Sequence, residues 1–276
     1  GTEYVLQNAQ PYSSLDMVLD GEGRAHIAAQ RRESQDLYYI TEDGAGSFSV
    51  ELAYDAPSAS VFPGGHNIAV AGDGTPHLAF PLVEDDRGNL YHAHPGSDGW
   101  ATESISYVGR GWSIPTIAVD ESGAPRIGYR SYPEFLYYFE YTGTQWQTNT
   151  VAREDSLGAP DLEVDGEGTI RMAYFFPPED EMRVVDPMNP SDGLSLSASS
   201  PTRAPSLAYG PSGHPHLVWM DDEDDLVTYA YYDGAEWQRE SFDQMGIYTD
   251  AALAVDSTGR PHVAYVYADR RSLRYA

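Results

Sequence analysis

The chain contains no cysteine and no lysine. Without cysteine it can form neither a disulfide framework nor a thiolate metal site. Because lysine is missing, 16 arginines face 43 acidic residues, and the formal charge of −27 repels a phosphate backbone or an anionic membrane surface. We therefore expect no nucleic-acid partner, and we expect neutral glycans, cations or basic peptides instead.

Long apolar runs are missing as well, so we expect no membrane insertion. Residues 1–10 lack the charged start and apolar centre of a signal peptide, which fits a mature chain or a trimmed domain. What the chain does have is 26 glycines, 19 prolines and 41% apolar residues, a composition typical of a turn-rich globular protein. A length of 276 residues suits one domain if that domain is a propeller or a barrel.

One sequence unit recurs six times without a gap, and this repeat decides the fold. The copies occupy residues 17–29, 68–80, 117–129, 162–174, 207–219 and 253–265. Their shared glycines follow one another at intervals of 45 to 51 residues, and they are Gly23, Gly74, Gly123, Gly168, Gly213 and Gly259. Four short strands need about that length.

Each unit predicts one four-stranded antiparallel blade. An apolar strand turns through Asp-x-x-Gly, where glycine can take a positive φ and aspartate can accept hydrogen bonds from nearby amides. A second strand follows, then a third such as Leu136–Phe139, and a fourth that opens with Trp100, Trp146 or Trp237. We therefore predict a single all-β domain over 1–276, a six-bladed β-propeller whose blades start near 15, 66, 115, 160, 205 and 251.

The two ends of the chain predict how the propeller closes. The last copy stops in its third strand at Leu273–Ala276, which leaves an edge that needs a partner. Glu3-Tyr4-Val5 fits the later part of the fourth-strand pattern seen around Trp100 and Trp237. We expect residues 1–8 to complete the last blade.

The motif Gly-x-Pro-His-x-Ala, at 74–79 and 259–264, resembles repeats of uncharacterised exported bacterial propellers, loosely grouped with BNR-repeat and sialidase-like proteins. The resemblance implies a propeller and a secreted, periplasmic or cell-surface location. It implies no particular activity, because one fold hosts many functions. The Asp-box of sialidases is not matched, since Tyr232–Trp237 lacks its serine and its spacing.

The repeat separates scaffold residues from candidate site residues, because a residue type found in most blades serves the blade. Three positions after each glycine stand long polar residues: His26, His77, Arg126, Arg171, His216 and His262. We expect them to bond locally to turn acids such as Asp20 or Asp256. His92 and His94 form an H-x-H pair on a third strand, which can bind a metal ion. The sequence identifies no third ligand, and we predict no metal site.

Glu163 breaks the pattern of the first strands, where the equivalent residues are Val18, Ala69, Ala118, Ala208 and Ala254. A buried carboxyl group with a raised pKa suits general acid or base catalysis, and a salt bridge to Arg171 or Arg126 is the structural alternative. Two residues earlier on the same face stand Asp16, Asn67 and Asp161, which we expect at the mouth of the central channel.

Loops that emerge at the same mouth carry aromatic and polar side chains of the kind that bind sugars. Our candidate ligand-binding residues are Asp16, Asn67, Trp112, Arg130, Tyr132, Asp221 and Tyr248. His66, at the end of a long loop, joins Glu163 and Asp161 as a catalytic candidate if the protein is an enzyme. We expect Trp219 and Phe175 to pack in the core. The acidic run 221–225 offers oxygen ligands for Ca²⁺, with a solvated turn as the alternative.

Three functions remain open. The leading hypothesis is an exported binding propeller that takes a glycan or a small polar ligand at the channel mouth. The second is a carbohydrate-active enzyme, a glycoside hydrolase or polysaccharide lyase, that uses mouth carboxylates with His66 or a tyrosine. The third is a structural module that contacts other protein domains. No phosphate loop, nucleophile elbow or zinc-protease helix is present.

Overall fold

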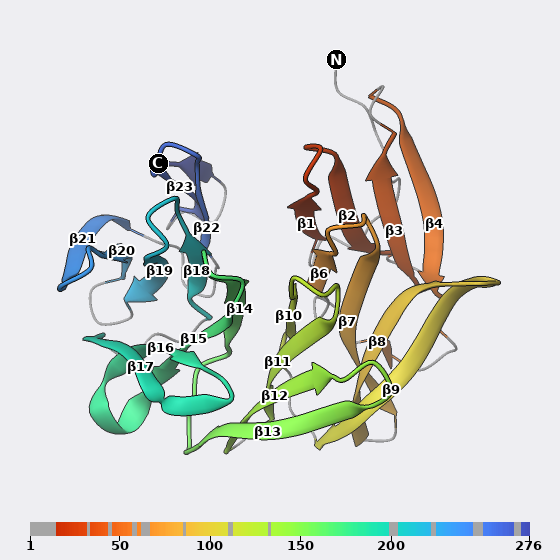
Figure 1. Ribbon diagram of the computed structural model, residues 1–276, viewed down its shortest axis with the longest axis horizontal. Helices are drawn as coiled ribbons and strands as arrows, with labels where there is room; N and C mark the ends of the chain where they lie inside the picture. Colours follow the sequence, from red (N-terminus) through yellow and green to blue (C-terminus); the bar gives the residue numbers. More distant parts are fainter. Residues whose placement is uncertain are drawn as a thin grey trace. The chain divides into compact units, whose positions relative to one another are not determined.

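The computed structural model describes residues 15–31, 34–43, 46–56, 60–61, 67–84, 87–109, 113–131, 134–198, 204–221, 225–244, 251–267 and 272–276. They form six antiparallel sheets, mostly with four strands each, and Figure 1 labels their strands. These sheets are the blades of a six-bladed β-propeller, as the repeat predicts. No helix in these ranges has the length and apolar character to cross a membrane.

The chain divides into two compact units. Unit 1 comprises Gly1–Ile127 with Glu140–Gln147, and unit 2 comprises Gly128–Phe139 with Thr148–Ala276. Blade three contributes residues to both. The prediction of a single domain over the whole chain stays a prediction, and each unit is described below by itself.

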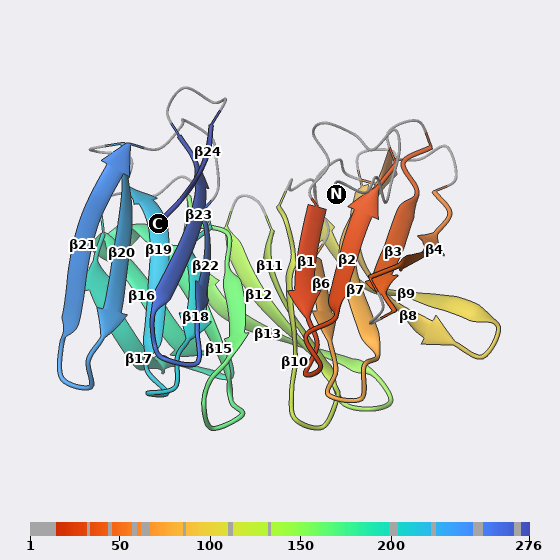
Figure 2. The same cartoon turned by 90° about the horizontal axis from the view of Figure 1, so that it is seen from above.

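Blades one and two belong to unit 1 (Figure 2). Blade one has the strand order β1-β2-β3-β4, which are Leu15–Leu19, Ala25–Gln30, Leu37–Glu42 and Phe48–Tyr54. Blade two consists of β5 to β9, which are Ser60–Val61, Asn67–Val70, Pro76–Glu84, Arg87–Gly96 and Gly99–Gly109. β6 pairs with the first part of β7, and the short β5, which the repeat does not predict, pairs with its last part.

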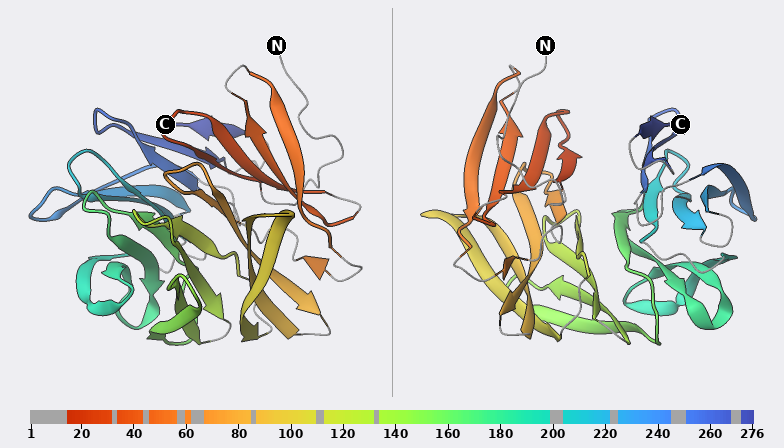
Figure 3. Two further views of the ribbon diagram at one scale, coloured as in Figure 1. Left: turned by 45° about the vertical axis from the view of Figure 1, so that its right-hand side comes forward. Right: turned by 180° about the vertical axis from the view of Figure 1, so that it is seen from behind.

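Blade three has the order β10-β11-β12-β13, which are Thr116–Val119, Pro125–Ser131, Phe135–Tyr141 and Trp146–Arg153. Blade four, in unit 2, contains β14 to β17 and a short 3-10 turn, η1, with the bounds Asp161–Val164, Ile170–Phe176, Glu181–Asp186, Asn189–Ser197 and, for η1, Pro177–Glu179. Figure 3 shows these sheets from two further directions.

Blades five and six complete unit 2. Blade five contains β18 to β21, which are Ser206–Tyr209, Pro215–Asp221, Leu226–Tyr232 and Trp237–Gln244. The last blade has three strands, β22 to β24, which are Ala251–Val255, Pro261–Val266 and Leu273–Tyr275. The strand that we expect at residues 1–8 lies outside the described residues, so closure through it stays a prediction.

The turn between the first two strands of each blade has the predicted chemistry. All six repeat glycines have positive φ, between 72° and 87°. In blade one, Asp20 Oδ1 accepts hydrogen bonds from the backbone amides of Glu22 and Arg24, both at 2.9 Å. Asp120, Asp165 and Asp256 accept the same pair of bonds in their blades.

The core lies between neighbouring blades of one unit. In unit 1, Phe80 and Leu78 of blade two pack with Leu37 and Tyr39 of blade one. In unit 2, Trp219 of blade five packs with side chains of blade four, among them Phe175. Trp219 and Phe175 are 1% and 3% exposed, which confirms that they are core residues.

Candidate functional site

The repeated histidines form local hydrogen bonds in three blades, and in blades one and six the turn acid takes part, as the sequence predicts. In blade one, His26 Nε2 donates to Asp20 Oδ2 at 3.2 Å, and its Nδ1 bonds to the Tyr39 hydroxyl at 2.5 Å. His216 binds the hydroxyl of Tyr229 at 2.6 Å. His262 binds the hydroxyl of Tyr275 and the carboxylate of Asp256. These three histidines are scaffold.

Blade two departs from this arrangement at both partners of its repeated histidine, His77, namely the third-strand tyrosine and the turn acid. His92 occupies the third-strand position of the tyrosines, because it pairs with Ala79 as Tyr39 pairs with Ala28. His77 Nδ1 therefore meets an imidazole, His92 Nε2, at 2.9 Å. In addition, Ala71 stands where blade one has the turn acid. Blade two has replaced the His–Tyr pair by two histidines.

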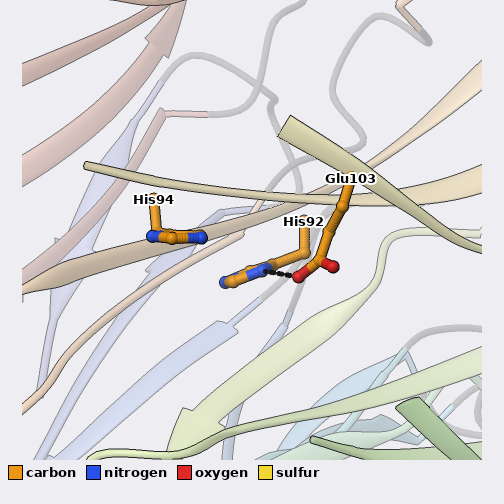
Figure 4. Close-up of side chains that lie close together, drawn as sticks. All are labelled: His92, His94 and Glu103. Atoms are coloured by element: carbon orange, nitrogen blue, oxygen red, sulfur yellow. Dashed lines mark hydrogen bonds and ion pairs between the residues drawn. The ribbon is translucent and has the colours of Figure 1, made fainter. Parts of the chain in front are cut away.

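Two further side chains join these histidines on the same face of the sheet. His92 lies directly opposite Glu103 on β9, and its Nδ1 is 3.0 Å from Glu103 Oε1 (Figure 4). His94 stands two residues after His92, so its side chain leaves the strand on the same side. The His92 and His94 rings stack with centroids 5.1 Å apart. We call His77, His92, His94 and Glu103 the histidine face.

Hydrogen bonding and burial define the protonation of the histidine face. A carboxylate only accepts, so His92 Nδ1 carries the proton, its Nε2 accepts, and His77 Nδ1 donates to it. Burial, with a smaller contribution from the neighbouring histidines, lowers the pKa of His77 to about 3. Burial also lowers the pKa of His92 to about 4, against the opposing effect of Glu103. Both rings are neutral at pH 7.

The histidine face lines a cavity of about 590 Å³ within unit 1. Its opposite wall comes from blade three and includes Arg126, Glu140 and Tyr141. The Arg126 guanidinium is held by Asp120 at 2.5 Å, by Glu140 at 3.1 Å and by the Tyr141 carbonyl at 2.7 Å. The volume falls within the range of about 300–1,000 Å³ typical of small-molecule sites. Aromatic, cationic and carboxylate groups thus surround one ligand-sized space.

The predicted mouth residues have a structural use that the sequence does not reveal. Asp16 Oδ2 accepts from the amide of Ile68 at 2.8 Å, and Asn67 Oδ1 accepts from the amide of Ile117 at 2.9 Å. Asp161 accepts in the same way from Leu207 at 2.8 Å. Each bond joins the first strand of a blade to the first strand of the next blade. That these residues also contact a ligand stays a prediction.

Glu163 is half-buried and lies two residues after Asp161 on β14. Burial raises its pKa to about 8, and the charge of Asp161 adds to the increase. Its cross-strand neighbour Arg171 bonds to Asp165 at 2.9 Å, and no ion pair of Glu163 exists among the described residues. The carboxyl group is therefore protonated at pH 7, which is the form that a general acid needs.

Of the other predicted site residues, the structure describes Arg130 and Asp221, and each has a local partner in unit 2. The guanidinium of Arg130 donates to the carbonyl of Leu157 at 2.7 Å. Asp221 is buried in blade five and forms an ion pair with Arg239 at 2.7 Å. Four candidates lie outside the described residues, namely His66, Trp112, Tyr132 and Tyr248, as does most of the acidic run 221–225. A Ca²⁺ site there stays a prediction.

Glu103 is the functional candidate that the sequence reasoning missed. Within the described ranges, His92, His94 and Glu103 are the group of possible metal ligands whose donor atoms all lie within 4.8 Å of one another. A signal was available, because glutamates stand opposite the third-strand tyrosines of blades one and five, as Glu51 and Glu240. Aligning the third and fourth strands as well as the first two would have placed Glu103 beside His92.

No protein-family model and no curated protein sequence matches this chain. Solved structures do match. AofleA from Arthrobotrys oligospora is 10% identical with a TM-score of 0.63, over 93% of this chain and 79% of its own. The Aleuria aurantia lectin, described as a six-bladed β-propeller with a novel fucose recognition mode, is 13% identical with a TM-score of 0.56, over 98% and 96%.

An enzyme is also among the similar structures. The polysaccharide lyase Uly1 is 10% identical with a TM-score of 0.53, over 96% of this chain and 76% of its own. The matches agree with a six-bladed propeller that is lectin-like in structure, and they give no support to the BNR part of the predicted resemblance. At these identities the likeness establishes the fold alone.

Proposed function

We propose that this protein is a glycan-binding propeller and that the cavity between blades two and three of unit 1 takes the sugar. The observation that carries the proposal is the lining of that cavity. Tyr141 offers an aromatic ring, and Glu140, Glu103 and His94 offer hydrogen-bonding groups on a space of about 590 Å³. Aromatic rings pack on the apolar faces of sugars, and carboxylates and imidazoles bind their hydroxyls.

Two further observations support a neutral glycan. Structures of Aleuria aurantia lectin, which has the same architecture, are complexes with Fucα1-6GlcNAc and with α-methyl-L-fucoside. The charge of −27 on this chain disfavours anionic polysaccharides through long-range repulsion. The channel mouth predicted from the sequence is the alternative location for the same ligand.

Binding to a glycan array, followed by titration calorimetry with the best neutral glycan, tests the proposal. We expect Tyr141→Ala to weaken binding at least about 10-fold, which corresponds to about 1.4 kcal/mol. The matched control is Tyr232→Ala in blade five, where the tyrosine packs on Trp237 as Tyr141 packs on Trp146. A glycan that binds both variants equally places the site elsewhere, and an array without any bound glycan refutes the function.

One observation favours a second function, carbohydrate cleavage. Glu163 has a pKa of about 8 and stands beside Asp161, the combination of a protonated and an ionised carboxyl group that acid–base catalysis on a glycosidic bond requires. Turnover of a polysaccharide by the wild type and its loss in Glu163→Gln would support cleavage. Binding without turnover in either protein would leave the lectin-like function.

A further inference from the structure

We propose that the histidine face of blade two binds a divalent transition-metal ion, with Zn²⁺ as the best match, through His92, His94 and Glu103. Glu103 and His94 also line the proposed sugar cavity, but the inference does not require a glycan, because it concerns the free protein and the metal alone. It starts from the one blade in which the repeated His–Tyr pair has become a pair of histidines.

The three ligands come from one hairpin. His92 and His94 are separated by one residue on β8, and Glu103 lies directly opposite His92 on β9. All three side chains therefore project from the same face of two paired strands, as Figure 4 shows. Their donor atoms lie within 4.8 Å of one another. Ligands of one Zn²⁺ ion are at most roughly 4.2 Å apart, so small side-chain rotations suffice.

Small residues leave room for the ion. Ala79 pairs with His92 on one side, and Ala101 pairs with His94 on the other. These two positions therefore contribute no large side chain beside the imidazoles. The larger neighbours are Trp146, whose ring meets the edge of His92 with centroids 5.3 Å apart, and His77, which stacks on His94 at 6.0 Å. Glu103 is 41% exposed and the cavity is open to solvent, so an ion can reach the ligands.

The outer partners of the ligands fit metal binding as well. Metal-bound histidines usually donate their second ring N–H to a fixed acceptor. His94 Nδ1 donates to the carbonyl of Pro95 at 2.9 Å, which leaves the lone pair on Nε2. In the metal-bound form His92 coordinates through Nδ1 and carries its proton on Nε2, which donates to His77 Nδ1. His77 then carries its proton on Nε2, so both rings change tautomer and stay neutral.

The choice of metal follows from the ligand set. Two neutral imidazoles and one carboxylate suit Zn²⁺ and related ions, whereas Ca²⁺ and Mg²⁺ prefer oxygen ligands. Three protein ligands leave one coordination position of a tetrahedral ion for water or for a ligand from the cavity. The corresponding positions of blade one, with Tyr39 and Thr41 opposite the second strand, cannot form such a set.

The test is titration of the chelator-treated full chain with Zn²⁺ by calorimetry, and with Co²⁺ as a probe read by its absorption spectrum. We expect one equivalent of tight binding in the wild type. Glu103→Gln and His94→Gln should each weaken it by at least about 100-fold, more than the 10–100-fold typical of outer partners. Glu240→Gln, at the equivalent position of blade five, should bind like the wild type.

Thermal unfolding without metal checks that each variant is folded before its Zn²⁺ affinity is compared with that of the wild type. Because Glu103 and His94 are partly exposed, we expect both variants to fold. Equal Zn²⁺ affinity in the wild type, Glu103→Gln and His94→Gln would overturn the site. So would a wild type that binds Zn²⁺ no tighter than it binds Mg²⁺, since that would be attraction to the acidic surface alone.

Discussion

Blade two and blade four both depart from the repeat, and they do so in opposite ways. In blade two the new polar residue, His92, finds hydrogen-bond partners on both sides, in His77 and Glu103. In blade four Glu163 replaces an apolar residue, and its nearest charged neighbour on the strand, Asp161, repels it. In blade two the new residue belongs to a hydrogen-bonded cluster of side chains, whereas in blade four it is a single carboxyl group whose pKa is raised to about 8.

The difference has a consequence for stability. A polar residue that replaces a repeat residue and finds hydrogen-bond partners lowers the free energy of unfolding little, because each buried polar atom has a partner. An unpaired carboxyl group makes the folded state depend on pH, because burial favours its protonated form. The two blades should therefore respond to pH in opposite directions. Burial keeps His77 and His92 neutral, so blade two should lose stability as the pH falls from about 6.5 toward 3, whereas blade four should lose stability as the pH rises from about 4.5 to 8.

The largest effect is expected at Glu163. With a pKa of about 8 when folded and an ordinary value near 4.5, its full contribution is present below pH 4.5. It is lost as the pH rises to about 8, and the whole loss is at most about 5 kcal/mol. Glu163→Gln should remove this loss, so that the variant is the more stable protein at pH 9. Urea unfolding at pH 5, 7 and 9 measures it.

Glu167→Gln is the control for this prediction, because Glu167 is an exposed turn residue of the same blade. Among the described residues, Asp161 acts on the charge of Glu163, Arg171 is its cross-strand partner, and Glu163 in turn acts on the hydroxyl of Tyr209. If the wild type and Glu163→Gln show parallel dependence on pH, the carboxyl group is ionised in the folded protein and the comparison between the two blades fails.

A smaller effect is expected when the partner of His92 is removed. His77→Ala leaves His92 Nε2 buried without its donor, which should cost about 1–3 kcal/mol of unfolding free energy. His262→Ala, at the same repeat position of blade six, should cost less than about 1 kcal/mol, because its side chain is 37% exposed and water can replace it. Urea unfolding at pH 7 compares them. Equal losses of unfolding free energy in the two variants would contradict the prediction that the His77–His92 hydrogen bond stabilises blade two more than the repeated histidine stabilises blade six.

Much of the fold could be predicted because the repeat is local. The Asp-x-x-Gly turns follow from a positive φ at residues such as Gly23 and from amides within four residues of Asp20. The bonds from His26 to Asp20 and from His262 to Asp256 were predictable for the same reason. The short β5 was not, because it depends on where a long loop meets the far end of β7.

The candidate site was harder to predict because its partners are distant in the sequence. Periodicity places Asp161 on a face, but it does not show that the amide of Leu207, on the next blade, occupies its oxygen. His92 was visible as half of an H-x-H pair. Its third partner, Glu103, required the register between β8 and β9, which depends on the exact position of the turn that pairs Gly96 with Gly99.

The smallest effect is expected from a substitution that makes blade two follow the repeat. His92→Tyr gives blade two the third-strand tyrosine of blades one, five and six, and Ala79 opposite it matches Ala28 and Ala264. Since His26 binds the hydroxyl of Tyr39 in that arrangement, His77 should bind the new hydroxyl. The free energy of unfolding without metal should therefore change by less than about 1 kcal/mol. Urea unfolding measures the change, and a loss above about 3 kcal/mol would mean that the core of blade two is shaped around the imidazole, so that the repeat no longer explains its scaffold.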